Sequence, residues 1–376
     1  MDCKTPGQLV KKLLEARGWS KRVLSIVLAV DESIVNKIVS DRRAVNASMA
    51  LLLGEAFNVN PERFLELQKS YDLAKARLVA QPDPHRATRA TLFGDLPIAE
   101  MMKRGWLDAH DIRDTKKVEK ELVKFFGVDS LNDIEILPHA AKKTNYSEIP
   151  TGAQFVWINR VRQIASEMIV GRYTPFTGRS AVKKLSALLL APNEARKVPR
   201  ILAESGIRFV IVESPPSAKI DGVCFWIDDQ SPVIGMSLRY DRIDNFWFVL
   251  RHELEHLIQN HGRNVVMVDA ELEGERAGTG ATVIKEERVA NEAAADFCVP
   301  KQELKKFITK KSPFFAERDI LGFAATLQIH PGLVAGQLQH QTSRYDRFRN
   351  HLVKIRHLVT PSAMVDGWGD VFPVEA

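Results

Sequence analysis

Hydrophobic and polar positions follow two different periods along this chain, and the change of period separates its parts. Residues 5–54 carry short apolar repeats at helical spacing, bounded by Gly, Ser and Asp, which predicts four helices joined by tight turns. Between residues 207 and 238 the pattern changes to short β-branched or aromatic runs punctuated by Pro, Gly and Asp. These runs predict strands at 207–212, 222–227 and 232–238. The fold class expected is therefore multidomain and mainly α, with a small β-sheet.

Helical spacing returns directly after the predicted strands. Leu250, Leu254, Leu257 and Ile258 stand at i, i+4, i+7 and i+8, which indicates a helix with one buried stripe. A second helix is predicted over 285–298, because that segment is rich in Ala, is acidic at its start and is closed by a proline at position 300.

The first of these two helices contains the motif HExxH. Residues four apart lie nearly above one another on a helix, so His252 and His256 can direct imidazole nitrogens at one cation. Glu253 would stand beside that cation as a general base. Zinc is the cofactor expected from this motif, since bound zinc lowers the pKa of a water molecule from 15.7 to roughly 7. Two imidazoles and a carboxylate also suit iron or manganese.

A zinc hydrolase of this kind needs a third protein ligand and an open fourth position. The segment 285–298 supplies two candidates. Glu287 and Asn291 would share one face of the predicted helix, and Glu292 and Asp296 would share another. Spacing alone leaves Glu287 and Glu292 as alternatives.

The region around the motif resembles the ImmA/IrrE family of metallopeptidases. The likeness is carried by the run 239–248 (RYDRIDNFWF), by the HExxH motif, by 287–291 (ERVAN) and by the Val-Pro pair at 299–300. The resemblance implies an α+β, zincin-like, zinc-dependent endopeptidase domain of a type that often cuts helix-turn-helix repressors. In the family pattern the third ligand stands four residues before the Asn, and this position is Glu287 here.

The N-terminal part resembles XRE-type, HigA-like helix-turn-helix domains over about residues 5–75. Matching features include the Pro-Gly pair at 6–7, the turn before Asp31, the run 40–43 (SDRR) and the run 60–65 (NPERFL). The resemblance implies that the helix over 31–40 enters the major groove of double-stranded operator DNA. The expected base readers are Ser33, Asn36 and Lys37, and the expected phosphate contacts are Lys21, Arg42 and Arg43.

Composition fits a chain of several domains. Its 376 residues suggest two or three, and its net charge of +6 and pI of about 9.1 modestly favour a nucleic-acid partner. The three cysteines lie too far apart in sequence to form a disulfide framework, which favours a cytoplasmic location. The sequence has no run of 18 apolar residues, so we expect no membrane span. The domains expected are 1–80 helix-turn-helix, 81–195 helical connector, 196–345 metallopeptidase and 346–376 basic C-terminal tail.

The function expected is that of a DNA-binding transcription regulator or HigA-like antitoxin with an endopeptidase domain that cuts a protein substrate. That substrate would be a repressor, a partner or the chain itself. The other expected protein partner is a toxin, and the protein would be a homodimer. The alternative is a DNA-binding antitoxin or repressor whose peptidase-like domain is a catalytically silent sensor or toxin-binding module. His261 and Tyr240 are further candidates for stabilising an oxyanion.

Overall fold

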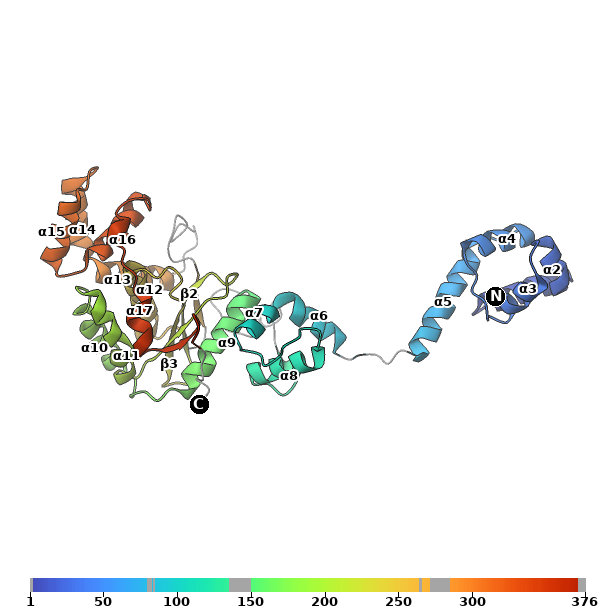
Figure 1. The fold of residues 1–376 in the computed structure, drawn as a ribbon, viewed down its shortest axis with the longest axis horizontal. Helices are drawn as coiled ribbons and strands as arrows, with labels where there is room; N and C mark the ends of the chain where they lie inside the picture. Colours follow the sequence, from blue (N-terminus) through green and yellow to red (C-terminus); the bar gives the residue numbers. More distant parts are fainter. Residues whose placement is uncertain are drawn as a thin grey trace. The chain divides into compact units, whose positions relative to one another are not determined.

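The computed structural model describes residues 3–79, 83, 85–134, 150–263, 266–270 and 285–370. The chain divides into two compact units, Met1–Pro84 and His85–Ala376 (Figure 1). It is mainly helical and has one small mixed sheet, as the sequence pattern predicts. Among the described residues, no helix combines the length and the apolarity needed to cross a bilayer.

The N-terminal unit is a bundle of helices around a single hydrophobic core. Side-chain oxygens of Thr5, Ser20, Asp31 and Asn46 accept hydrogen bonds from backbone N–H groups in the first turns of α1 to α4, which explains where these short helices begin. The helices are α1 (Pro6–Arg17), α2 (Lys21–Val27), α3 (Glu32–Val39), α4 (Ala47–Phe57) and α5 (Glu62–Val79).

A close contact between α1 and the end of α3 explains the Pro-Gly pair near the N-terminus. Asp41 accepts hydrogen bonds from the Thr5 hydroxyl at 2.6 Å and from the Gly7 backbone N–H at 2.9 Å. A Cβ atom at Gly7 would lie 2.6 Å from the carbonyl oxygen of Ile38, so only glycine fits there. The contact fixes α3, the predicted recognition helix, against α1.

The second unit contains the sheet and the remaining helices. Its strands are β1 (Arg208–Val212), β2 (Ile220–Trp226), β3 (Pro232–Met236), β4 (Met267–Ala270) and β5 (Met364–Asp366). Its α-helices are α6 (Arg86–Asp95), α7 (Ile98–Lys103), α8 (Thr115–Phe126), α9 (Gly152–Glu167), α10 (Pro175–Ser186), α11 (Val198–Glu204), α12 (Ile243–Ile258), α13 (Lys285–Cys298), α14 (Lys301–Lys311), α15 (Glu317–Leu327), α16 (Pro331–Thr342) and α17 (Arg356–Val359).

The strand order is β4-β2-β3-β1-β5. β2 runs antiparallel to both of its neighbours, whereas β1 runs parallel to β3 and β5. Because successive side chains of a strand point to opposite faces, Phe209 and Ile211 join one core while Val210 and Val212 join another. The sheet is therefore buried on both faces, with α12 packed on one and α9 on the other.

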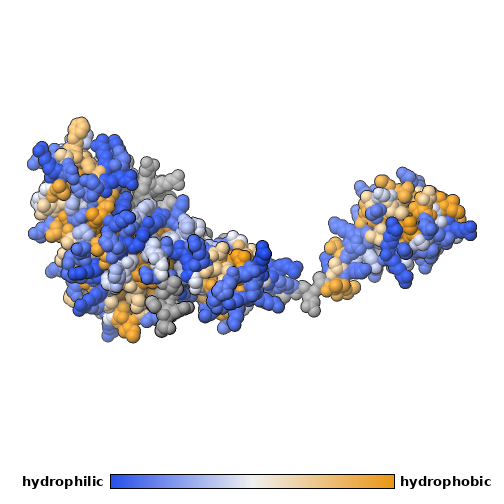
Figure 2. Space-filling model, in the orientation of Figure 1, coloured by the Kyte–Doolittle hydropathy of each residue, from blue (hydrophilic) through white to orange (hydrophobic). Residues whose placement is uncertain are grey.

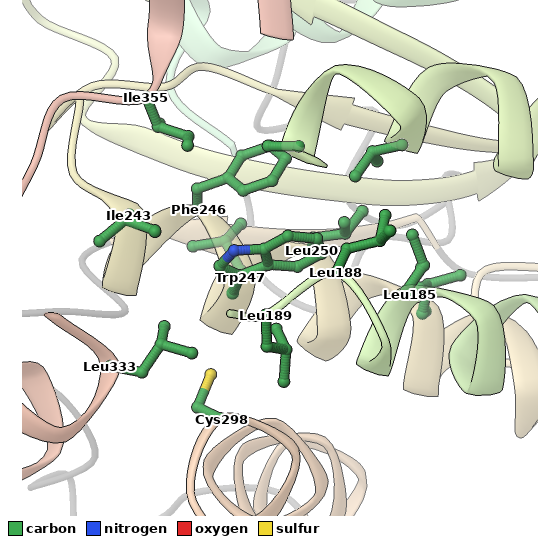
Figure 3. Close-up of a cluster of buried hydrophobic side chains, with 14 of the residues drawn as sticks. Leu185, Leu188, Leu189, Ile243, Phe246, Trp247, Leu250, Cys298, Leu333 and Ile355 are labelled. Atoms are coloured by element: carbon green, nitrogen blue, oxygen red, sulfur yellow. The ribbon is translucent and has the colours of Figure 1, made fainter. Parts of the chain in front are cut away.

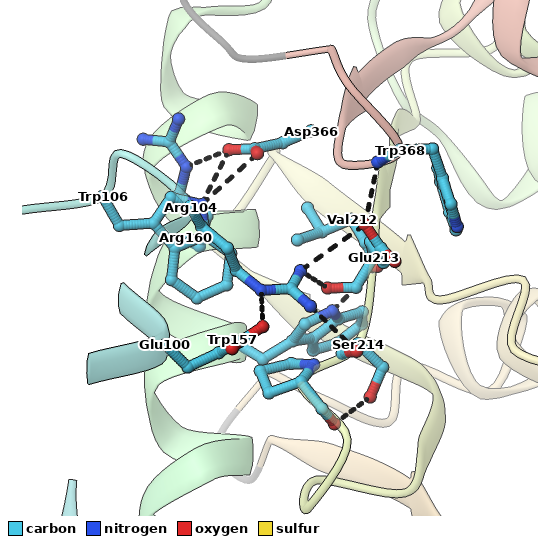
Figure 4. A network of polar contacts seen from close by, with 11 residues as sticks. Glu100, Arg104, Trp106, Trp157, Arg160, Val212, Glu213, Ser214, Asp366 and Trp368 are labelled. Atoms are coloured by element: carbon cyan, nitrogen blue, oxygen red, sulfur yellow. Dashed lines mark hydrogen bonds and ion pairs between the residues drawn. The ribbon is translucent and has the colours of Figure 1, made fainter. Parts of the chain in front are cut away.

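The connector and the tail expected from the sequence differ from what the structure shows, because both belong to the second unit. Helices α6 to α9 share a hydrophobic core with the strands, and β5 from the expected tail pairs with β1. Figure 4 shows how the tail is fastened: the buried carboxylate of Asp366 pairs with Arg160 of α9 and accepts from the Trp106 indole N–H. Sequence periodicity did not reveal this, since the contacts join residues more than 200 positions apart.

The core on the α12 side positions the predicted active helix. Phe246, Trp247 and Leu250 of α12 pack against Leu185 and Leu189 from the α10 region (Figure 3). Burial of large aromatic residues on one side of α12 fixes its rotation about its own axis, and thereby fixes where its histidines point.

Figure 2 shows hydrophilic residues over much of the visible surface of both units.

Candidate metal centre

α12 carries both histidines of the HExxH motif in the interior of the second unit. The helix begins after Arg242, whose guanidinium pairs with the buried carboxylate of Asp244 in the first turn. His252 and His256 are fully buried, and their Nε2 atoms lie 3.0 Å apart. The i, i+4 spacing thus brings two imidazole nitrogens to one point, as predicted from the sequence.

α13 packs against α12 and supplies the third group. Glu287 Oε2 lies 3.3 Å from His252 Nε2, and Glu287 Oε1 lies 3.5 Å from His256 Nε2. Glu292, the alternative left open by spacing, is exposed to solvent. Of the two candidates, Glu287 is therefore the one that the structure brings to the histidines.

These three residues have the donor set expected for a zinc site with an open position. One ligand atom from each lies within 4.8 Å of the other two, and among the described residues this is the group of His, Cys, Asp and Glu side chains that meets the distance test for a metal site. Burial works against ionisation of Glu287, but its contacts with His252 and His256 outweigh burial and hold the pKa of Glu287 well below its usual value. A carboxylate held ionised beside two imidazoles fits a divalent cation.

Glu253, the expected general base, is fully buried beside β2. A Cβ atom at Gly222 of β2 would overlap its Oε1 atom, so the absence of a side chain at position 222 provides the space that the carboxylate occupies. The β2–β4 register shifts at the same place, between Ile220 and Gly222. Such bulges often occur beside active sites, where they redirect a side chain. The role of Gly222 has no signal in the sequence, because it depends on how α12 lies across the sheet.

His261 lies beyond the end of α12 and contacts the second motif histidine. Its Nδ1 atom is 3.0 Å from His256 Nδ1. Burial, and then the neighbouring His256, lower the pKa of His261. This placement, on the Nδ1 side of His256 rather than beside the converging Nε2 atoms, differs from the oxyanion position expected from the sequence. The other oxyanion candidate, Tyr240, is 40% exposed and stacks against Arg239.

The six predicted DNA contacts are all exposed in the N-terminal unit. On α3, Val35 and Ile38 are buried in the core while the predicted base readers face solvent. The exposed set is Lys21, Ser33, Asn36, Lys37, Arg42 and Arg43. Unlike the metal-centre residues, they do not converge on a point but are spread over α2, α3 and the segment that follows α3.

Comparison with known proteins finds relatives for part of the chain. The chain is 34% identical over 86 residues to virulence-associated protein A′ of Dichelobacter nodosus, which covers 20% of this chain and 75% of that protein. It is 33% identical over 72 residues to virulence-associated protein I of the same organism, covering 19% of this chain and 67% of the relative. Over this fifth of its length, the chain belongs to the family of these virulence-associated proteins. No protein-family model matches the chain.

Proposed function

We propose that this protein is a cytoplasmic, DNA-binding regulator that carries a zinc-dependent endopeptidase in its second unit. The observation that supports the peptidase most strongly is the meeting of His252, His256 and Glu287, from two helices, within 3.5 Å of one another. Two imidazoles and one carboxylate, with Glu253 next in sequence to the first histidine, are the groups that a zinc hydrolase of this type requires.

In the proposed mechanism the chain's own residues hold the cation and move one proton. His252 and His256 would bind through Nε2, and Glu287 would bind through its carboxylate. Zinc bound there supplies a Lewis acid and a water molecule of lowered pKa. Glu253 accepts the proton of the attacking water and passes it to the leaving amine, and its burial beside Gly222 fixes its carboxylate for both transfers.

An extended peptide is the substrate class that the sheet favours. β4 stands at one end of the strand order and pairs with β2, the strand that carries Gly222 beside Glu253. A peptide that adds to a sheet edge gains backbone hydrogen bonds in a fixed register, which places one peptide bond repeatedly at the same position. A repressor, a partner toxin or a segment of the chain itself would each meet this requirement.

The N-terminal unit is proposed to bind operator DNA as part of a homodimer. Helix-turn-helix proteins commonly read two half-sites through two copies of the recognition helix. The unit also exposes apolar side chains on α2 and α4, among them Ile26 at 72% and Leu51 at 56%, which a second copy would cover.

Metal analysis and proteolysis of the purified full chain test the peptidase. We expect one zinc per chain, and we expect cleavage of peptide libraries or of co-expressed repressors to fall about 100-fold to 10,000-fold in Glu253→Gln, since a general base contributes that much. Glu255→Gln is the matched control, because Glu255 lies in the same motif but pairs with Arg251 and Gln259. Absence of both zinc and Glu253-dependent cleavage would leave the alternative, a silent module that senses a signal or binds a toxin.

A further inference from the structure

His261 is held at the end of α12 by contacts that are independent of its ring. Its backbone N–H donates to the carbonyl of His256 at 2.8 Å, and its own carbonyl accepts from the Trp226 indole N–H at 3.0 Å. The next residue, Gly262, has a φ of 77° and lies so close to Cys224 that a Cβ atom would be 2.9 Å from the Cys224 carbonyl oxygen. The backbone of His261 is thus fastened to α12 through its N–H and to β2 through its carbonyl and Gly262, which restricts where its Nδ1 atom lies.

The contact between the two rings allows only one hydrogen between them. His256 Nδ1 and His261 Nδ1 are 3.0 Å apart, so one nitrogen carries a proton and the other accepts it. If the proton were on His261, the neutral His256 would carry its own proton on Nε2, pointing at His252 and Glu287. If the proton is on His256 Nδ1, the Nε2 lone pair is free to bind a cation. The two arrangements differ in whether the site can accept a metal.

From this geometry we propose that His261 is a positioning residue that accepts the Nδ1 proton of His256 and so keeps His256 in its metal-binding tautomer and orientation. The proposal rests on the metal centre proposed above. Residues that orient a metal-binding histidine in this way are usually carboxylates or carbonyl groups, and their loss typically weakens metal binding about 10-fold to 100-fold. Here the acceptor is a second histidine, contributed by the turn that ends the same helix.

Two variants separate positioning from simple packing. In His261→Ala the acceptor is lost, whereas in His261→Asn the side-chain oxygen can stand near the position of Nδ1 and accept the same proton. We expect zinc affinity, measured in the full chain by competition with a chelator, to fall about 10-fold to 100-fold in His261→Ala and to be largely restored in His261→Asn. His110→Ala, at an exposed histidine of the same unit, is the matched control and should leave the affinity unchanged.

Two spectroscopic readouts complete the test. The absorption bands of the cobalt-substituted protein should shift in His261→Ala and return toward the original spectrum in His261→Asn, because they report the orientation of the ligands. Nitrogen NMR of the metal-free protein should show the proton of His256 on Nδ1. A proton on Nε2 there, or equal zinc affinity in all variants, overturns the role of His261 and leaves the peptidase proposal standing. If the unaltered chain binds no zinc, the peptidase proposal fails, and the NMR result still decides the tautomer.

Discussion

The two units place their candidate functional residues in opposite environments. In the N-terminal unit the six candidates are exposed and spread along the surface. In the second unit His252, Glu253 and His256 are fully buried, and Glu287 lies beside the two histidines. A metal centre is complete within one chain, so folding alone must bring its groups together. A DNA interface is completed only by its partner, so its groups remain exposed until DNA binds.

This difference also determines which substitutions are informative. A buried polar group costs free energy unless it is paired. Truncating one such side chain in the second unit leaves its partner unpaired and alters the packing of α12, in addition to removing the functional group. Variants there need to keep the shape of the side chain. In the N-terminal unit, truncation of an exposed residue rarely changes stability by more than about 0.5 kcal/mol, so alanine variants are adequate.

The largest expected effect concerns the two acidic residues of α13. Glu287→Gln removes the negative charge beside both histidines, and we expect zinc affinity to fall by more than the roughly 10-fold to 100-fold typical of losing an orienting partner. Glu292→Gln, five residues along on the exposed face of the same helix, should leave the affinity unchanged. Chelator competition measures both. If Glu287→Gln and Glu292→Gln had equal zinc affinities, the assignment of Glu287 as the third metal ligand would be wrong.

A second large effect is expected at Gly222, which contributes no functional group of its own. In Gly222→Ala the new methyl group would occupy the position of the Glu253 carboxylate and displace it, while the three metal-binding groups stay in place. Since a misplacement of about 1 Å can cost 100-fold in rate, we expect a loss of that order with the zinc content retained.

The control for Gly222 is Gly322→Ala in α15, where an added Cβ meets nothing within 4 Å. That variant should keep full peptidase activity. Normal cleavage by Gly222→Ala would show that the position of Glu253 over β2 is unimportant, and would weaken its assignment as the base.

The residues of the candidate metal centre were largely predictable from the sequence, and the exception has a clear physical reason. The HExxH spacing identifies both histidines because it depends on one helix alone. The third ligand depends on how α13 is rotated against α12, and the choice between Glu287 and Glu292 was made by family resemblance. A physical signal was present: Ala290, Ala294 and Cys298 are buried at i, i+4 and i+8, and Glu287 continues that stripe three residues earlier.

The architecture around the site was less predictable. The three central strands were expected from their β-branched runs, but β4 and β5 were not, because they are short and gain their stability from pairing with distant strands. The same limitation explains the helices α6 to α9. The segment 81–195 was expected to be a helical connector, yet nothing local indicated that α9 covers the second face of the sheet.

In the N-terminal unit smaller effects should distinguish base readers from phosphate contacts. We expect Asn36→Ala to cost about 1–3 kcal/mol on the preferred operator and to relax sequence preference. Arg43→Ala should weaken binding to all sequences alike and reduce the slope of log affinity against log salt by about 0.9. Lys69→Ala, exposed on α5, is the control. Binding isotherms at several salt concentrations measure these effects, and a uniform loss in Asn36→Ala would contradict its role as a base reader.

The smallest expected effect is on how the stability of the second unit depends on pH. All ten histidines of the chain lie in that unit. His330 begins α16, where its Nδ1 atom accepts a hydrogen bond from the Gly332 N–H at 3.0 Å and must therefore be unprotonated. Burial, and then the nearby His351, lower the pKa of His330 below 6.5. The unfolded chain thus binds a proton at His330 more readily than the folded chain does. The contribution of the neutral His330 to the free energy of unfolding is therefore complete above pH 6.5, and it is lost as the pH falls from there through the folded-state pKa.

His330→Asn keeps a cap acceptor that does not titrate, so the metal-free second unit should lose less stability between pH 7 and pH 5 than the unaltered chain does. Denaturant titrations of the full chain at both pH values measure this difference. The unfolding transition of the N-terminal unit, which has no histidine, should respond equally in both proteins. An identical pH dependence of the second unit in both would show that the His330 cap does not couple folding to protonation.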